Sequence, residues 1–435
     1  MGYIEDYCYF ASGTEVPEEY LRWGALSILG HVLGHKVWVQ HGDYFPFYPN
    51  LYVCLVGNPG SGKNTALSIN FKIMLKVFPD MVVSSSVQSP QDMLDKIASP
   101  DCVQTWKDET GVYREKVAQK IYEYRSFYVL NNELASFLEH NKIGMVKLLT
   151  EGYDGDVLST GYKGQRIANP ERNQVARNPF ISLLAGAVPD WFMGDLKLDL
   201  FKGGLGRRLI IVNCDRNKIV PVPKKPVGAD DSLLKAIAYL KEASSFFGQV
   251  NLTPAALKWW EPWYIKHKQE VHTDPILLQF HGTKSVAVLK VAMLLSLSNK
   301  LSYDLEAEYL ELALSYVHSL EPKVVRLTSG LGRNDIAAVG VDLMSHIERL
   351  GGAVPETVLL KAYHRYLRDP EFIELCNHFC QTGELVVTVN GEGKRCWFLA
   401  DRYQTFLKEK ATASQAQTAN PSSPTTAPTP PVQPS

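Results

Sequence analysis

The stretch from Leu51 to Leu67, LYVCLVGNPGSGKNTAL, constrains the fold of this chain more than any other. It opens with an uncharged apolar run, Leu51 to Val56, passes through a glycine-rich turn that ends at Lys63, and continues into a run of helical composition. Strand, glycine-rich turn and helix in this order are the setting of a phosphate-binding loop. The stretch therefore predicts an α/β fold that carries a nucleotide site.

Each part of the turn suits a phosphate ligand. Its glycines let the backbone curl until successive N–H groups point at phosphate oxygens. The helix that follows adds the partial positive charge of its N-terminus, and its lysine adds a full charge for the β- and γ-phosphates of ATP. The alternative is a plain strand-to-helix turn with an exposed lysine. The predicted nucleotide-binding residues are Gly57, Asn58, Pro59, Gly60, Ser61, Gly62, Lys63, Asn64 and Thr65.

One position departs from the usual pattern of such loops. The residue after the lysine is normally a Ser or Thr that binds Mg²⁺, whereas this chain has Asn64. Thr65 follows, but the helix turns its side chain about 100° further round. This departure concerns the metal and not the nucleotide, so ATP binding is still expected. The Mg²⁺ ion is expected to arrive with the nucleotide and to contact Asn64.

A second apolar run ends in an acid. Phe127 to Leu130 is followed by Asn131, Asn132 and Glu133. In P-loop enzymes such a strand ends in an acid that orients the metal, and a glutamate after it activates water. Asn132 takes the first place and Glu133 the second, so Glu133 is the predicted catalytic acid and Asn132 a predicted Mg²⁺ contact. The alternative is a buried strand that ends in a solvated acid.

Two arginines follow another glycine-rich turn, GGLGRR, and precede the apolar run Leu209 to Val212. An arginine in such a place can act as a finger that neutralises charge on the phosphoryl group bound by a neighbouring subunit. Arg207 is the preferred catalytic candidate, ahead of Arg208. The alternative is that both arginines make surface salt bridges.

Three further features are expected to approach the nucleotide. The strand Phe180 to Leu184 is predicted to lie next to the strand of the glycine-rich turn, which would bring Ser182 or the loop after it near the γ-phosphate. Lys284 and Lys290, on a predicted helix, are candidates for a lid residue.

The segment from Glu151 to Arg177 is rich in glycine and basic residues and suggests a hairpin or a mobile loop. A positive loop beside an ATPase core can grip a nucleic-acid backbone. Lys163 and Arg166 are therefore predicted DNA contacts, although a solvated surface loop explains the same composition.

The bulk composition limits the classes of protein that fit. The chain has 435 residues, 45% of them hydrophobic and 21% charged, which suits a globular protein of several domains. Its net charge is −1, so DNA binding must come from local patches. Seven scattered cysteines without paired spacing indicate reduced thiols and a cytoplasmic location. The start of the chain does not resemble a signal peptide, and the apolar runs fall short of the roughly 20 residues of a membrane helix, so no membrane partner is expected.

The chain is expected to divide into five parts. Within them, a helix should begin near Pro17, strands should cover Lys36 to Val39 and Met81 to Val83, and the aromatic residues after Tyr44 should form a loop. Residues 101–120 are predicted to form a loop and a surface helix, and residues 230–329 should be helical throughout. The parts are 1–50, an N-terminal helix and strand; 51–215, the ATPase core; 216–330, a helical lid-like domain; 331–402, a winged-helix module; and 403–435, a disordered tail rich in Ser, Thr and Pro.

The winged-helix module is predicted from three helical runs, 334–350, 355–367 and 370–381, followed by a hairpin around 390–393. Its third helix carries acids and no Lys or Arg, which does not suit a groove reader. The wing carries Lys394 and Arg395, which are predicted DNA contacts, and docking to a protein is the alternative. Three nearby cysteines are read as a buried face rather than a metal site: Cys376, Cys380 and Cys396.

These motifs together resemble a family of P-loop ATPases encoded by phages and mobile elements, which are replicative-helicase-like or are known only as domains of unknown function. The likeness covers about residues 10–400 and rests on YPNLYVCLVGNPGSGKNTAL, FYVLNNELASFL, NPFISLLAGAVPDWF, GGLGRRLIIV and TKSVAVLKVAMLLSLS. It implies a RecA/AAA+-like core, a homo-oligomer such as a hexameric ring, ATP hydrolysis between subunits and DNA as the track. Lys63, Glu133 and Arg207 would be its lysine, acid and finger.

The sequence therefore favours an ATP-driven motor on DNA, a helicase-type ATPase that works with other replication proteins of a phage or mobile element. A nucleotide-binding regulatory or assembly protein with little turnover is one alternative. A DNA-packaging ATPase is another, although it would need a nuclease with clustered acidic metal ligands, which the sequence does not suggest.

Overall fold

The structure is a computed structural model. It describes residues 2–79, 83–84, 89–107, 121–139, 142–155, 158–159, 175–193, 204–214, 218–270, 275–328, 335–364, 367–389 and 394–404. The chain forms two compact units, Met1–Leu331 and Gly332–Ser435. Lys163 and Arg166 of the predicted DNA-binding loop lie outside the described residues, and so does the tail after residue 404.

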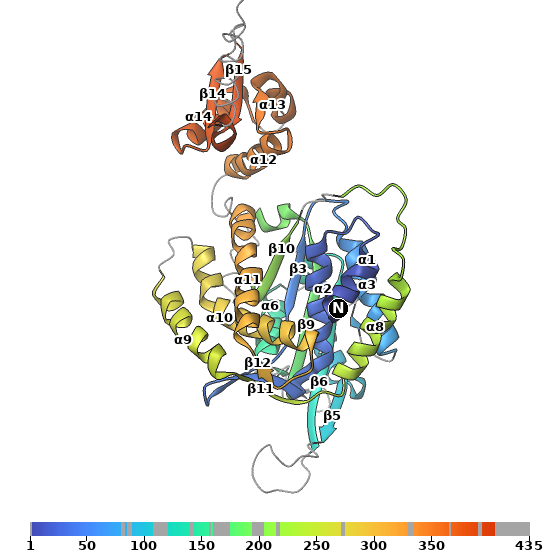
Figure 1. Ribbon diagram of the computed structural model, residues 1–435. Helices are drawn as coiled ribbons and strands as arrows, with labels where there is room; N and C mark the ends of the chain where they lie inside the picture. Colours follow the sequence, from blue (N-terminus) through green and yellow to red (C-terminus); the bar gives the residue numbers. More distant parts are fainter. Residues whose placement is uncertain are drawn as a thin grey trace, which may run out of the picture. The chain divides into compact units, whose positions relative to one another are not determined.

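A mainly parallel sheet organises the first unit (Figure 1). Its central strands are buried along their whole length, as expected where helices cover both faces of a sheet. The expected α/β class is therefore confirmed. The strand order is β10 (Leu209–Asn213), β3 (Tyr52–Val56), β9 (Pro179–Ala187), β6 (Ile121–Asn131) and β4 (Val83–Ser84), with β5 (Val103–Lys107) antiparallel to β6.

Alternate residues of β3 face different hydrophobic cores. Val53 and Leu55 belong to the core on one side of the sheet. Tyr52, Cys54 and Val56 belong to the core on the other side. The first core includes α1 (Tyr3–Ala11), α2 (Glu18–Leu33) and α3 (Lys63–Val77), and the second includes α4 (Pro90–Ala98), α5 (Leu134–Glu139) and α6 (Lys142–Asp154).

A second sheet in the same unit corrects the expectation that residues 230–329 are helical throughout. Its order is β12 (Asp304–Leu305), β11 (Gly248–Leu252), β1 (Val37–His41) and β2 (Phe45–Phe47). The short strands β11 and β12 pair with each other, and β11 pairs with β1, far away in the sequence. The helices around them are α8 (Ala229–Ala243), α9 (Pro254–Gln269), α10 (Pro275–Asn299) and α11 (Ala307–Thr328).

Three other local predictions are settled. The helix predicted near Pro17 is confirmed, since α2 begins at Glu18 with Pro17 at its N-cap. The prediction of an aromatic loop after Tyr44 is wrong in part, because β2 pairs antiparallel with β1. The prediction of a loop from residue 101 is also wrong in part, because β5 pairs with β6 over five positions. In both cases the segment pairs antiparallel with the strand next to it in chain order, which its own composition did not indicate.

Within its described residues, the second unit contains three helices and a three-stranded antiparallel sheet of order β13, β15, β14. The three helices and the final hairpin agree with the sequence expectation, whereas β13 was not predicted. Trp397 is a fully buried member of its core. The elements are α12 (Asp335–Arg349), β13 (Ala353–Pro355), α13 (Glu356–Tyr363), α14 (Asp369–Gln381), β14 (Leu385–Val389) and β15 (Arg395–Leu399).

Part of α10, Phe280–Asn299, is long and apolar enough to cross a membrane by length and composition, with a mean hydropathy of 1.2. However, 78% of its most apolar window is buried inside the fold. Core helices pass the same test, so this helix is weak evidence for a membrane span.

Candidate functional site at the carboxyl edge of the sheet

The parallel strands bring several sequence candidates to one edge of the main sheet. Val56 pairs with Ala187 of β9 on one side and with Asn213 of β10 on the other, so the three strands end side by side. Asn131, at the end of β6, pairs with Ala185. In open α/β sheets, ligands bind in the crevice beyond the carboxyl ends of the strands. The segments that begin at this edge are residues 57–62, Asn132 and Glu133, residues 188–193, and Cys214.

Residues 57–62, here called the glycine loop, connect β3 to α3. Gly60 and Gly62 have φ angles of +84° and +88°, which are costly for residues with a Cβ. A Cβ on Gly57 would lie 2.6 Å from both the Tyr20 hydroxyl and Ser61 Oγ. The first N–H groups of α3 have no partner within the helix. The loop and the helix start can therefore offer several N–H donors and a partial positive charge to an anion.

Lys63 is the first residue of α3, and its side chain is buried. Its ammonium folds back over the loop, donating to the Gly57 carbonyl, to the Asn58 carbonyl at 3.2 Å and to Ser61 Oγ at 3.4 Å. Burial lowers the pKa of Lys63, while the nearby Glu133 carboxylate raises it. The lysine charge thus lies inside the loop, held by carbonyl groups that a phosphate oxygen can replace.

Glu133 lies at the same edge, directly before α5. It is close enough to Lys63 and Cys54 to affect the pKa of both side chains. Its backbone N–H donates to Asn131 Oδ1 at 2.8 Å, so Asn131 fixes the turn in which Glu133 stands. Asn132 is exposed, and its carbonyl lies only 2.6 Å from where a Cβ on Gly186 would be. Gly186 therefore allows the turn after β6 to pack against β9.

Other residues at this edge carry no motif and were missed by the sequence reading. The Tyr20 hydroxyl of α2 contacts the Val56 carbonyl at 2.5 Å and the Cys214 carbonyl at 2.8 Å, which ties α2 to the ends of β3 and β10. Glu19 accepts from Cys214 Sγ at 2.7 Å and pairs with Lys323 of α11. Acids in the first turn of a helix are common, so no sequence signal distinguished these residues.

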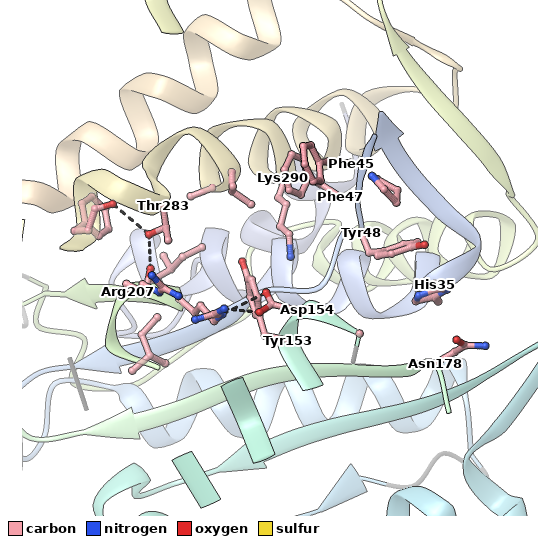
Figure 2. Close-up of a pocket in the computed structure, with 18 residues that line it drawn as sticks. His35, Phe45, Phe47, Tyr48, Tyr153, Asp154, Asn178, Arg207, Thr283 and Lys290 are labelled. Atoms are coloured by element: carbon pink, nitrogen blue, oxygen red, sulfur yellow. Dashed lines mark hydrogen bonds and ion pairs between the residues drawn. The ribbon is translucent and has the colours of Figure 1, made fainter. Parts of the chain in front are cut away.

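Arg207 and Arg208 lie at the opposite edge. They occupy a 3₁₀ turn, Gly206–Arg208, directly before β10, whose first residue pairs with Tyr52 at the start of β3. Arg208 pairs with Asp154 and donates to the Gly204 carbonyl at 2.9 Å, whereas the Arg207 side chain is exposed (Figure 2). At the amino edge, Arg208 therefore has a structural role, whereas the side chain of Arg207 is exposed to solvent.

Both arginines line a cavity of about 610 Å³ at the amino edge (Figure 2). Lys290 of α10 is buried there. Its ammonium donates to Asn50 Oδ1 at 2.9 Å and lies 3.8 Å from the centre of the Tyr153 ring. Burial lowers the pKa of Lys290 to about 7. Lys290 thus holds α10 against Asn50, two residues before β3.

Three expected approaches to the nucleotide can be compared with the structure. Ser182 lies near the start of β9, next to Leu183, which pairs with Tyr52, and its hydroxyl contacts His31 Nδ1 at 3.2 Å. The loop after β9, not Ser182, reaches the carboxyl edge. Lys290 is bound at the amino edge, and Lys284 forms an ion pair with Glu321. Neither lysine contacts the glycine loop in the described part of the chain.

In the second unit, Lys394 and Arg395 are exposed at the start of β15. Arg395 lies 3.8 Å from Glu356, which also accepts from the indole of Trp397 at 3.2 Å. Of the three cysteines expected on a buried face, Cys376 is buried in the core of this unit, and Cys380 and Cys396 are partly buried.

The carboxyl edge thus combines a glycine loop, a helix N-terminus, a buried lysine and a carboxylate, which suits a bound polyphosphate and the activation of a water molecule. No protein-family model matches this chain, and no curated protein is significantly similar to it.

Proposed function

We propose that this protein is a P-loop ATPase of the RecA/AAA+ type that binds ATP and Mg²⁺ at the carboxyl edge of its main sheet and works as a helicase-type motor on DNA. The observation that carries the proposal is the placement of Lys63 and Glu133. One follows β3 and the other follows β6, and β9 lies between these strands. The intervening strand leaves room for phosphate and water between a cation and a base at one edge.

Each residue has a distinct role in this proposal. The N–H groups of the glycine loop and of the start of α3 hold the phosphates, and Lys63 moves from the Gly57 and Asn58 carbonyls to the β- and γ-phosphates. Glu133 accepts a proton from the attacking water. Asn64 and Asn132 would contact a Mg²⁺ ion or its waters, and the ion would supply positive charge to the phosphates.

Arg207 completes the site from a second copy of the chain. It stands at the amino edge, so it cannot reach the nucleotide of its own chain without rebuilding β10. An exposed arginine at one edge and a phosphate site at the other suit head-to-tail association, which gives rings when the rotation closes. A hexameric ring in the cytoplasm, without a membrane partner, is the assembly that fits this proposal.

The second unit supports a role on DNA less directly. Helix, strand, two helices and a β-hairpin in this order are what a winged-helix module would have, and Lys394 and Arg395 would then belong to its wing. Arg395 is partly neutralised by Glu356, so docking to another replication protein remains the alternative for this unit.

The test is phosphate release by the full chain, with and without single-stranded DNA. We expect ATP turnover that DNA stimulates, loss of ATP binding in Lys63→Ala, and retained binding without turnover in Glu133→Gln. Lys72→Ala, on the same helix, is the matched control and should behave as the wild type. Normal binding and turnover in Lys63→Ala would overturn the site.

A second function, regulation by nucleotide binding with little turnover, is favoured by Asn64 and Asn132. Both replace groups that normally hold Mg²⁺. Tight ATP binding with no DNA-stimulated phosphate release, at any Mg²⁺ concentration, would select this function over the motor.

A further inference from the structure

The cavity at the amino edge of the main sheet is not used by the proposed ATP site, which lies at the opposite edge. Its volume of about 610 Å³ suits a small organic ligand rather than a polymer. Its described wall comes mainly from four parts of the first unit: β2 with the residues after it, the end of α6, the turn before β10, and α10. Segments far apart in the sequence therefore build one space of ligand size.

One end of this cavity is aromatic (Figure 2). Phe45 and Phe47 of β2 line it together with His35 and Tyr48, whose rings stack with their centroids 3.7 Å apart. Burial lowers the pKa of His35 to about 4, so its ring is neutral at pH 7. This end therefore offers uncharged ring faces, against which a flat apolar ring can pack.

The middle of the cavity is positively charged. Lys290 is only 3% exposed, yet its ammonium contacts neutral groups, which are two oxygens of Asn50 and the face of the Tyr153 ring. Asp154 is near enough to raise the pKa of Lys290, but its carboxylate pairs with Arg208. A buried charge held by neutral groups is costly. Among the described residues, the two cations in the middle of the cavity thus face one carboxylate.

Arg207 adds a further cation at the turn before β10. Its side chain is exposed, and its carbonyl accepts from Thr283 Oγ1 at 2.6 Å, which fixes the turn against α10 (Figure 2). Thr283 and Lys290 are seven residues apart, so they lie on one face of α10, separated by about 10 Å. A long arginine side chain can span much of this distance, so an anion between Lys290 and the turn is within reach of both cations.

We propose that this cavity binds a small organic anion, in which a flat aromatic ring carries a carboxylate or a phosphate group. The ring packs against His35, Phe47 and Tyr48. The acidic group lies beside Lys290, and Arg207 binds it through two parallel hydrogen bonds. The anion supplies the negative charge that the surroundings of Lys290 lack. This proposal does not depend on ATP binding at the carboxyl edge.

The test measures the binding of naphthoate to the full chain by equilibrium dialysis. Naphthalenemethanol, which has the same ring without the charge, is the matched control ligand. We expect one naphthoate per chain and at least tenfold weaker binding of the alcohol. Naphthyl phosphate is titrated in parallel on the wild type and on Arg207→Ala. Its binding counts as binding in the cavity only where Arg207→Ala weakens it, because the glycine loop also suits a phosphate.

Two variants remove the cations of the cavity. Arg207→Ala, at an exposed side chain, should weaken naphthoate binding at least tenfold, and Lys290→Met should do the same. Arg177→Ala is the matched control, because Arg177 is exposed beside Asn178 of the wall but is not part of the described wall itself. It should bind naphthoate as the wild type does. Because Lys290→Met changes a buried side chain, Arg207→Ala decides the matter if that variant fails to fold.

A second readout is the pH dependence of binding. Burial lowers the pKa of Lys290 to about 7, so a bound anion should favour the charged amine. Naphthoate affinity should therefore rise several-fold from pH 8.5 to pH 6.5, and this rise should vanish in Lys290→Met. Of the other groups that face Lys290, Asp154 and Arg208 pair with each other, and burial raises the pKa of Tyr153 out of this range.

Three outcomes would overturn the proposal. They are equal naphthoate affinity in the wild type and Arg207→Ala, equal affinity of the wild type for naphthoate and naphthalenemethanol, and no binding of either acid by the wild type.

Discussion

The buried His31 makes the stability of the first unit depend on pH. This residue of α2 lies between β9 and β6, with Nδ1 3.2 Å from Ser182 Oγ and Nε2 3.3 Å from Ser126 Oγ. Its ring stacks on Tyr128 with centroids 4.9 Å apart. Burial lowers the pKa of His31 to about 3, from an ordinary value of 6.5. The folded protein therefore holds His31 neutral over a pH range in which the unfolded chain protonates it.

The sign and size of the effect follow from these values. As pH falls below about 6.5 the unfolded chain takes up the proton first, so stability is full above that pH and is lost toward pH 3. At pH 5 the unfolded pKa is 1.5 units above the solution pH, which corresponds to about 2 kcal/mol at ~1.36 kcal/mol per unit. The loss continues to about 5 kcal/mol only below pH 3.

The perturbation is His31→Gln, whose amide keeps a hydrogen bond with one of the two serines but does not titrate. The assay is urea unfolding followed by circular dichroism at pH 7.5 and pH 5. We expect the loss of stability between these pH values to be about 2 kcal/mol smaller in His31→Gln than in the wild type. His318→Asn, at an exposed histidine, should match the wild type.

Other buried histidines do not obscure this comparison. Burial lowers the pKa of His35 and of His267 to about 4, so both add to the acid sensitivity of every variant equally. Equal pH slopes in the wild type and His31→Gln would refute the reasoning, because His31 would then accept a proton within the fold.

Three further predictions concern the proposed ATP site. Tyr20→Phe leaves two carbonyls at the ends of β3 and β10 without their hydroxyl partner, so the free energy of unfolding should fall by about 1–3 kcal/mol. ATP affinity should fall with it, and thermal unfolding with and without ATP can measure both effects. Asn64→Ser with Asn132→Asp should lower the Mg²⁺ concentration needed for half-maximal turnover, and an unchanged requirement would place the metal on other residues. Arg207→Ala protomers mixed with Glu133→Gln protomers should regain phosphate release, and a protein that stays monomeric in light scattering with ATP would exclude this complementation.

The central strands of the main sheet could be predicted from the sequence because they are apolar runs bounded by turns, whereas the polar strand β5 could not. Leu51 to Val56 and Phe180 to Leu184 read as buried strands, and the structure pairs them as neighbours. The second sheet could not be predicted, because β11 is short and its partner β1 lies some two hundred residues earlier. Pairing over that distance depends on the packing of the helices between the strands, which no local pattern records.

The candidate site could likewise be predicted from the sequence only in part. The glycine loop, Lys63 and Glu133 were recognisable because phosphate chemistry needs those residue types in a fixed order along the chain. Tyr20 and Lys323 reach the same edge from α2 and α11, and their sequence surroundings resemble those of any amphipathic helix. The distance between Arg207 and the glycine loop also depends on the direction of β10, which becomes clear only when its pairing with β3 is known.

The direction of β10 decides what kind of assembly the proposed chemistry needs. β10 has five residues, which span about 17 Å, and Arg207 precedes it while Cys214 follows it at the edge of the glycine loop. A strand paired along its length cannot shorten without losing the hydrogen bonds that hold it. An arginine finger at position 207 therefore acts on the nucleotide of another copy, through an interface that joins the amino edge of one sheet to the carboxyl edge of the next. Because those two surfaces differ, such copies can associate head to tail, and the assembly is then a closed ring or a filament.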